Sequence, residues 1–270
     1  MNESRHGGDR IHRQASISRI TALAAIVALV AALAGCRGKG TAAAHPQLTV
    51  SAASSLQKAI GQYADGFDAA EIKASFAGSD ELAAQIQSGL KPDVFAAANT
   101  KLPQMLYAKG LVHKPVVFAA NRLVIAVPAG SNKVRSLDDL AGEGVTVAAG
   151  SPSVPVGAYT RKLLGELPTA RRGAIVANIR SNEPDVKGVV GKLTQGAVDA
   201  GFVYITDVNA ANGKLRSIEL PGNLNPSVAY GIAIVTGAKH PAEAQKFIDG
   251  LLSGTGQAAL TKAGFKPPPK

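Results

Sequence analysis

The stretch "LTVSAASSLQKAI", residues 48–60, begins as an apolar strand and continues into the pattern of a helix. From Leu56 to Phe67 the apolar residues recur at the three- and four-residue spacing of an amphipathic helix. A serine at such a junction can cap the helix by accepting a backbone N–H group, and Ser54 with Gln57 fits a capping box. Alternatively, the free N–H groups of the first turn, with hydroxyls beside them, can bind an anion. The junction alone leaves both interpretations open.

The same order of strand, polar turn and helix recurs three more times. The stretches are "IKASFAGSDELAAQIQSG" (72–89), "VTVAAGSPSVPVGAYTRKLLGEL" (145–167) and "SNEPDVKGVVGKLTQG" (181–196). In the last of them, Pro184 suits the first helical position and Asn182 its cap. A buried strand in "DAGFVYITD" (199–207) follows and carries Tyr204 at its carboxyl end. This alternation predicts an α/β fold with mainly parallel sheets, in which ligands bind at the carboxyl ends of the strands.

Two extended apolar stretches, "NRLVIAVP" (121–128) and "AYGIAIV" (229–235), lack the alternation of a half-exposed strand. Each is therefore expected to be buried on both faces. A lobe inserted between them would make a hinged two-lobe protein with its ligand in the cleft. We expect the first lobe to comprise residues 47–123 and 233–270, and the second lobe to comprise residues 124–232.

The first 35 residues have the pattern of an export signal. Several arginines precede an uncharged apolar run, "ITALAAIVALVAALAG" (20–35), which is too short for a comfortable membrane span of about 20 residues. The run leads into Cys36, the only cysteine of the chain, and resembles a bacterial lipoprotein signal. We therefore expect a signal peptide over residues 1–35, a lipidated Cys36 and a tether over residues 36–46. The alternative is an ordinary cleaved signal followed by a free thiol.

The composition is that of a globular protein, with 46% hydrophobic and 18% charged residues among 270. The net charge is +10, but Lys and Arg are scattered and aromatic residues make up only 4%. A nucleic-acid surface, which combines basic residues with stacking aromatics, is therefore not indicated. A modest positive charge favours attraction of a small anion instead.

Motifs of the common enzyme classes are missing or out of context. The sequence has no G-x-S-x-G nucleophile motif, and its His, Cys and carboxylate residues lack metal-ligand spacing. The stretch "GTGQAA" (254–259) matches a dinucleotide fingerprint but falls within a predicted helix rather than after a strand. The sequence therefore favours a binding protein over an enzyme, and indicates no cofactor.

Several short motifs follow one another in a specific order and spacing. They are "VSAASSL" (50–56), "FAGSDELAAQIQSG" (76–89), "PDVFAAAN" (92–99), "NRLVIAVP" (121–128), "SPSVPVGAY" (151–159), "PDVKGVVGKLTQGAVDAGFVY" (184–204) and "GFKPP" (264–268). In this order they resemble the periplasmic molybdate-binding proteins of bacterial ABC transporters, over residues 48–267. The resemblance implies two α/β lobes joined by two crossover strands, which close on a tetrahedral oxyanion.

The resemblance also implies a site made of neutral hydrogen-bond donors. Ser55 and Ser79 would each offer a hydroxyl and a backbone N–H group. Val156 and Val186 would offer backbone N–H groups from the inserted lobe, and Tyr204 its phenolic O–H. Such donors, held at helix starts, can bind a dianion without the cost of desolvating a lysine.

With Ser55 as a ligand residue, Ser54 is expected to be the helix cap. Two acidic residues, Asp80 and Asp185, stand next to proposed donors. Both fall in first helical turns, where the helix dipole favours an acidic side chain, so both are expected to point to solvent. If either faced the ligand, its carboxylate would instead favour a protonated oxyanion such as phosphate.

The signal and Cys36 predict a protein anchored by lipid on the extracytoplasmic face of the cell membrane, and we expect it to be a monomer. The resemblance implies its role. Such a protein captures molybdate or tungstate and delivers it to the permease of an ABC transporter. Phosphate, sulfate or another small anion remains the alternative ligand.

Overall fold

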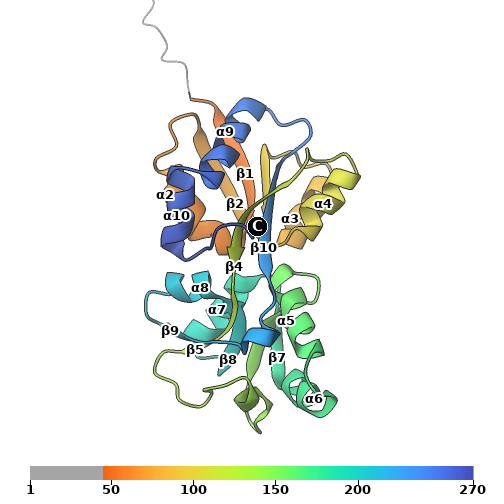
Figure 1. The fold of residues 1–270 in the computed structure, drawn as a ribbon, viewed down its shortest axis with the longest axis vertical. Helices are drawn as coiled ribbons and strands as arrows, with labels where there is room; N and C mark the ends of the chain where they lie inside the picture. The colour runs from red at the N-terminus through yellow and green to blue at the C-terminus, as the bar shows by residue number, and fades with distance from the viewer. Residues whose placement is uncertain (1–44, 270) are drawn as a thin grey trace, which may run out of the picture. The chain divides into compact units, whose positions relative to one another are not determined.

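The computed structural model describes residues 45–269, which belong to one of two compact units of the chain, His45–Lys270. The predicted signal, Cys36 and most of the tether lie outside the described residues. The described unit contains two five-stranded sheets, each with helices packed against it (Figure 1). Each sheet with its helices forms one lobe.

The first lobe is built on the sheet β2-β1-β3-β10-β4. Its strands are β1 (Gln47–Ala53), β2 (Glu71–Ala77), β3 (Val94–Ala97), β4 (Val116–Asn121) and β10 (Val228–Ile234). Its helices are α2 (Gln57–Ala64), α3 (Ser79–Gln87), α4 (Lys101–Ala108), α9 (Pro241–Leu252) and α10 (Thr255–Ala263), with the 3-10 turn η1 (Ser54–Leu56) before α2. Helices α2, α9 and α10 lie on one side of this sheet in Figure 1, and α3 and α4 on the other.

The second lobe is built on the sheet β7-β6-β8-β5-β9. Its strands are β5 (Leu123–Pro128), β6 (Val147–Gly150), β7 (Ile179–Glu183), β8 (Ala200–Tyr204) and β9 (Leu215–Ile218). Its helices are α5 (Pro155–Gly165), α6 (Thr169–Asn178), α7 (Val186–Thr194) and α8 (Ile205–Ala210), with the 3-10 turns η2 (Asp138–Ala141) and η3 (Gly222–Leu224).

Both sheets are mainly parallel, as the alternation of elements predicts, but each is made mixed by one strand that runs opposite to the other four. Strand β1 is parallel to β2 and β3, but β10 is antiparallel to β3 and β4. In the second sheet, β6 is parallel to β7 and β8, but β5 is antiparallel to β8 and β9. The reason lies in the crossings between the lobes. A strand that brings the chain in from the other lobe runs opposite to the strands whose carboxyl ends face that lobe.

The chain crosses between the sheets at two places. Only Arg122 separates β4 in the first sheet from β5 in the second, close to the expected boundary after residue 123. On the return, all of β10 from Val228 onward pairs within the first sheet. The boundary expected after residue 232 therefore falls inside a strand, and hydrogen bonding assigns residues 228–232 to the first lobe.

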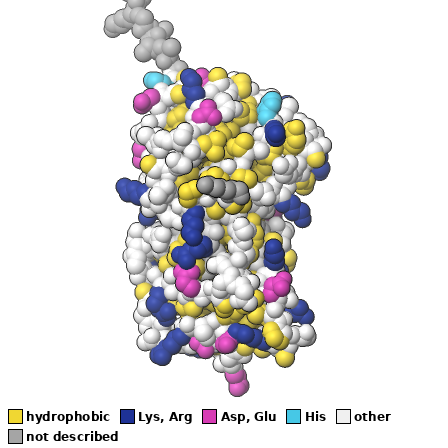
Figure 2. Space-filling view, in the orientation of Figure 1, with side chains coloured by type: hydrophobic (Ala, Val, Ile, Leu, Met, Phe, Trp, Pro, Cys, Tyr) yellow, Lys and Arg dark blue, Asp and Glu magenta, His cyan; other side chains and the backbone are white. Residues whose placement is uncertain are grey.

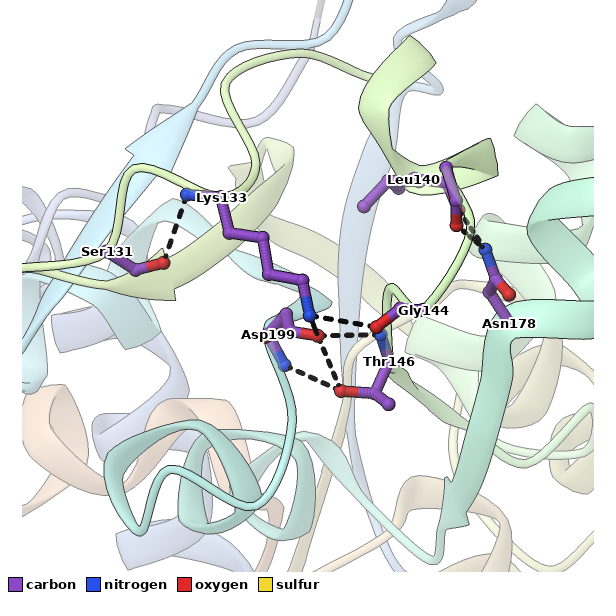
Figure 3. A network of polar contacts seen from close by, with 8 residues as sticks. Ser131, Lys133, Leu140, Gly144, Thr146, Asn178 and Asp199 are labelled. Carbon is purple, nitrogen blue, oxygen red and sulfur yellow. Dashed lines mark hydrogen bonds and ion pairs between the residues drawn. The ribbon is translucent and has the colours of Figure 1, made fainter.

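The two lobes repeat one polar contact at the same place in each sheet. In the second lobe, the Asp199 carboxylate accepts hydrogen bonds from the Thr146 backbone and hydroxyl, both at 2.8 Å, and from Lys133 Nζ at 2.8 Å (Figure 3). In the first lobe, the Asp93 carboxylate accepts from the Thr49 backbone at 2.8 Å and hydroxyl at 2.6 Å. Each aspartate precedes a buried strand, β3 or β8, and joins it to the parallel strand beside it, β1 or β6. The sequence repeat of strand and helix is therefore also a structural repeat.

Basic side chains are dispersed over the surface. On the face drawn in Figure 2, Lys and Arg lie apart from one another and are interspersed with Asp and Glu. None of the helices in the described part of the chain is both long and apolar enough to cross a membrane.

Candidate anion-binding site

A small pocket lies between the two lobes. Its lining residues follow the carboxyl ends of β1, β2 and β3 in the first lobe and of β6, β7 and β8 in the second. All five residues predicted to contact an anion are among those that line it: Ser55, Ser79, Val156, Val186 and Tyr204. The pocket volume is ≈ 20 Å³, little more than the roughly 10–15 Å³ that a single water needs. As it stands, the pocket has room for a small group and not for a sugar or a peptide.

Helix starts supply the backbone donors. The structure gives no side-chain cap to η1, α3 or α5 among the described residues, so their first N–H groups are not taken by a neighbouring side chain. In α5 the first residue is Pro155, which has no N–H group, so Val156 provides the first donor of that helix. Unpartnered N–H groups at helix starts carry partial positive charge and bind anions.

Two predicted caps are wrong. Ser54 makes no capping hydrogen bond, because residues 54–56 form a 3-10 turn that leads directly into α2. At the fourth junction, Asn182 lies within β7 and α7 begins only at Val186. Its cap is Asp185, whose side chain accepts a hydrogen bond from the Gly188 N–H at 3.0 Å. Asp185 is extended, so the helix begins two residues later than the position of Pro184 predicted.

The hydroxyl of each of the two serines makes a hydrogen bond within the protein. The Ala98 N–H group donates to Ser79 Oγ at 3.1 Å, and the Ser55 and Tyr230 hydroxyl oxygens are 2.9 Å apart. Both serines are almost fully buried. Because Ser79 Oγ already accepts a hydrogen bond, its own proton remains available to a ligand in the pocket.

Tyr204 ends β8 and is 1% exposed, with its ring in the interior. Tyr204 lines the pocket, and its Oη atom is buried and has no hydrogen-bond partner among the described residues. Burial raises the pKa of Tyr204 well above its usual value, and the nearby Tyr230, Tyr159 and Asp207 raise it further. The hydroxyl therefore keeps its proton at neutral pH and needs an acceptor.

Asp207 holds the segment that carries Tyr204 through a hydrogen bond to its backbone. The Tyr204 N–H group donates to Asp207 Oδ2 at 3.2 Å, and Lys187 Nζ lies 3.4 Å from Asp207 Oδ1. Burial raises the pKa of Asp207 to about 6, although the positive charge of Lys187 opposes the rise. Sequence reasoning missed this carboxylate, because an aspartate three residues after a strand is indistinguishable from an exposed helix-start residue.

The two acidic neighbours differ from the expectation that both point to solvent. Asp185 lines the pocket while it caps α7. Asp80 does not line the pocket, yet its Oδ1 atom is buried and has no hydrogen-bond partner among the described residues. Among the described residues that line the pocket there is no Lys or Arg, so the donors are neutral, and the one carboxylate beside them is that of Asp185.

Comparison with known proteins identifies the family of this chain. The family model for bacterial extracellular solute-binding proteins matches residues 48–266. The molybdate-binding protein ModA of Mycobacterium tuberculosis is 34% identical over 227 residues, which are 82% of this chain and 85% of that protein. The chain belongs to the ModA family of bacterial extracellular solute-binding proteins.

Two further proteins are similar to this ModA-family chain, one in sequence and one in structure. A Bacillus subtilis protein provisionally named ABC transporter substrate-binding lipoprotein YvgL is 30% identical over 226 residues, 81% of this chain and 85% of that protein. The periplasmic molybdate-binding protein of Azotobacter vinelandii has a TM-score of 0.74 at 23% identity, covering 82% of this chain and all of that one. The predicted two-lobe binding-protein fold is thereby confirmed, and the family is one of extracellular solute-binding proteins.

Proposed function

We propose that this ModA-family protein captures molybdate or tungstate in the pocket between its lobes and delivers the anion to the permease of an ABC transporter. The observation that carries the proposal is Tyr204, a residue of the pocket lining whose protonated, buried hydroxyl has no hydrogen-bond partner among the described residues. A buried donor without an acceptor is costly unless a ligand satisfies it. The names of the relatives, which are molybdate-binding proteins, support the choice of oxyanion.

Neutral donors suit a doubly charged ligand in a closed pocket. Burying a lysine beside the anion would cost the desolvation of a second charge, whereas hydroxyls and helix-start N–H groups are already fixed in place. Because the donors come from both lobes, the anion contacts all of them only when the lobes are close together. The protein would therefore act as a binding protein in which the ligand stabilises the closed arrangement, and we assign it no catalytic step, no cofactor and no partner copy.

The charge on Asp185 favours a second candidate, phosphate. At neutral pH molybdate, tungstate and sulfate carry no proton, whereas phosphate largely does. A carboxylate in the pocket could accept the phosphate proton, but it would repel an unprotonated dianion. The position of Asp185 as the cap of α7 argues against phosphate. One carboxylate oxygen of Asp185 already accepts a hydrogen bond from the Gly188 N–H group.

Titration calorimetry with molybdate, tungstate, sulfate and phosphate separates the two candidates. We expect tight binding of molybdate and tungstate, weaker binding of the smaller sulfate, and little binding of phosphate. Asp185→Asn keeps a capping side chain, so molybdate affinity should stay unchanged or improve. Asp80→Asn is the matched variant outside the pocket. If phosphate bound to the wild type as tightly as molybdate, and this binding were lost in Asp185→Asn, the protein would be a phosphate receptor.

We further propose that Cys36 is lipidated and anchors the protein on the outer face of the cytoplasmic membrane. The apolar run before this cysteine supports the proposal, as does the naming of the B. subtilis relative as a lipoprotein. Mass spectrometry of the mature N-terminus and membrane fractionation of cells test it. Cys36→Ala should be released or remain unprocessed, and a wild-type protein that is soluble and starts elsewhere would contradict the anchor.

A further inference from the structure

A buried chain of polar side chains leads from the crossover between the lobes to Ser55. Asn121, the last residue of β4, donates from Nδ2 to Thr206 Oγ1 at 2.9 Å and to Tyr230 Oη at 3.3 Å. Tyr230 Oη lies 2.9 Å from Ser55 Oγ. All four side chains are almost completely buried, with exposures between 0% and 5%, so water does not compete for these contacts.

The hydrogen bonds at the Asn121 end of this chain have a fixed direction. The Arg122 N–H group donates to Asn121 Oδ1 at 2.9 Å, which identifies the other end of the amide as the NH₂ group. An NH₂ group can only donate, so Tyr230 Oη accepts from Asn121. If Tyr230 Oη donates its own proton onward, the acceptor is Ser55 Oγ, 2.9 Å away.

This order leaves the Ser55 proton unused within the protein. A serine hydroxyl has one proton, and with Ser55 Oγ accepting from Tyr230 the proton is free to point into the pocket that Ser55 lines. Ser79 is arranged in the same way, because its Oγ accepts from the Ala98 N–H group. In this arrangement both serines, one in η1 and the other at the start of α3, have their acceptor side occupied by a donor from the protein.

We propose that Tyr230 is a positioning residue for the anion, which holds the Ser55 hydroxyl as a donor toward the pocket. The inference rests on the proposed function, because it assigns an orientation to a residue of the oxyanion site. Tyr230 itself does not line the pocket, and its hydroxyl reaches the anion only through Ser55. The polar chain also ties this orientation to the crossover, since Asn121 contacts Thr206 in the second lobe.

Packing is the other role that Tyr230 could play. Its ring lies edge-on to Phe118, Tyr204 and Phe265, with centroid distances of 6.3, 6.0 and 5.3 Å. Tyr230→Phe keeps this ring and removes only the hydroxyl, so it separates orientation from packing. Tyr107→Phe, on the exposed face of α4, is the matched control.

A double-mutant cycle measured by molybdate calorimetry tests the proposal. We expect Tyr230→Phe to weaken molybdate binding by about 3–10-fold, the range of one neutral hydrogen bond, and Tyr107→Phe to leave it unchanged. Ser55→Ala should weaken binding more, and adding Tyr230→Phe to it should cause no further loss. Thermal melts of each ligand-free variant verify that the fold is kept.

Three outcomes would overturn the proposal. Wild-type affinity in Tyr230→Phe, with Ser55→Ala weakened, would remove the positioning role and leave the proposed function intact. An equal loss from Tyr230→Phe with and without Ser55 would show that Tyr230 acts through packing. A wild-type protein that binds no oxyanion would overturn both the site and the role of Tyr230.

Discussion

Gly78 of the first lobe lies directly against the backbone carbonyl of Pro184 in the second. A Cβ atom at residue 78 would be 2.6 Å from Pro184 O and 2.9 Å from Asp80 Oδ1, closer than such atoms approach one another. Gly78 is also the N-cap of α3 and lines the pocket beside Ser79. The closeness of the two lobes at the pocket thus depends on the absence of a side chain at this position.

Gly78→Ala should therefore weaken anion binding by preventing this approach. The methyl group must displace a backbone oxygen, and overpacking of this kind costs about 1–3 kcal/mol. We expect a loss of molybdate affinity of about that size in calorimetry. Gly61→Ala, in α2 where a Cβ meets nothing within 4 Å, should bind like the wild type. Equal affinities for Gly78→Ala and Gly61→Ala would mean that binding does not require the close approach.

Tyr204→Phe should change affinity and stability in opposite directions. The anion loses a donor, which weakens binding by about 1.5–3 kcal/mol for a hydrogen bond to a charged group. The ligand-free protein loses a buried hydroxyl that has no partner among the described residues, so its free energy of unfolding should stay the same or rise. Urea unfolding without ligand and calorimetry with molybdate measure the two effects. A variant that is less stable without ligand would imply a partner for Tyr204 Oη within the protein.

Asp207 should make stability depend on pH in mildly acidic solution. Burial raises its pKa from 3.8 to about 6 in the folded protein, against the opposing charge of Lys187 and with a further rise from Asp185. Between about pH 4 and 6 the folded state therefore binds more protons than the unfolded state, and stability falls as the pH rises. At 1.36 kcal/mol per unit, ionisation of Asp207 costs about 3 kcal/mol above pH 6.

Asp207→Asn removes this ionisation. Relative to the wild type, its free energy of unfolding should improve by about 3 kcal/mol between pH 4 and 7, as measured by urea unfolding at a series of pH values. Two stability curves that run parallel over this range would show that the carboxylate is not buried as described.

Thr146→Val should destabilise the second lobe without affecting the pocket. The substitution removes the hydroxyl that donates to the Asp199 carboxylate at 2.8 Å and accepts from its backbone N–H at 3.1 Å. Leaving these groups unpaired costs about 1–3 kcal/mol, and molybdate affinity should not change. Thr49→Val, at the equivalent contact with Asp93, should have an effect of the same sign in the first lobe.

The Thr146 effect should also depend on pH. Burial alone would raise the pKa of Asp199, but hydrogen bonds from Lys133 and Thr146 outweigh it, and the pKa lies below its usual value. The stabilisation from these bonds is therefore present above about pH 4 and lost as the pH falls through the folded pKa. The cost of Thr146→Val should shrink in acid, and a cost independent of pH would assign it to packing alone.

The local pattern of the sequence determined the elements and the places where a ligand could bind. Strand, polar turn and helix repeat in "LTVSAASSLQKAI" and its three counterparts because period-two and period-3.6 burial are local properties of the chain. The family motifs then selected Ser55, Ser79, Val156, Val186 and Tyr204, which all line one pocket in the structure. Their contact with an anion stays a prediction.

Only the tertiary structure decided what depends on residues far apart in the chain. The way in which the two sheets meet decides the direction of β5 and β10. It also decides that Asp185 and not Asn182 caps α7, and that Asp207 is buried. The contact of Ser55 with Tyr230 spans 175 residues, and Tyr230 lies in an apolar strand whose sequence predicts only core. No local pattern can contain such a pair, because the side chain that orients a hydroxyl is chosen by the fold and not by its neighbours in sequence.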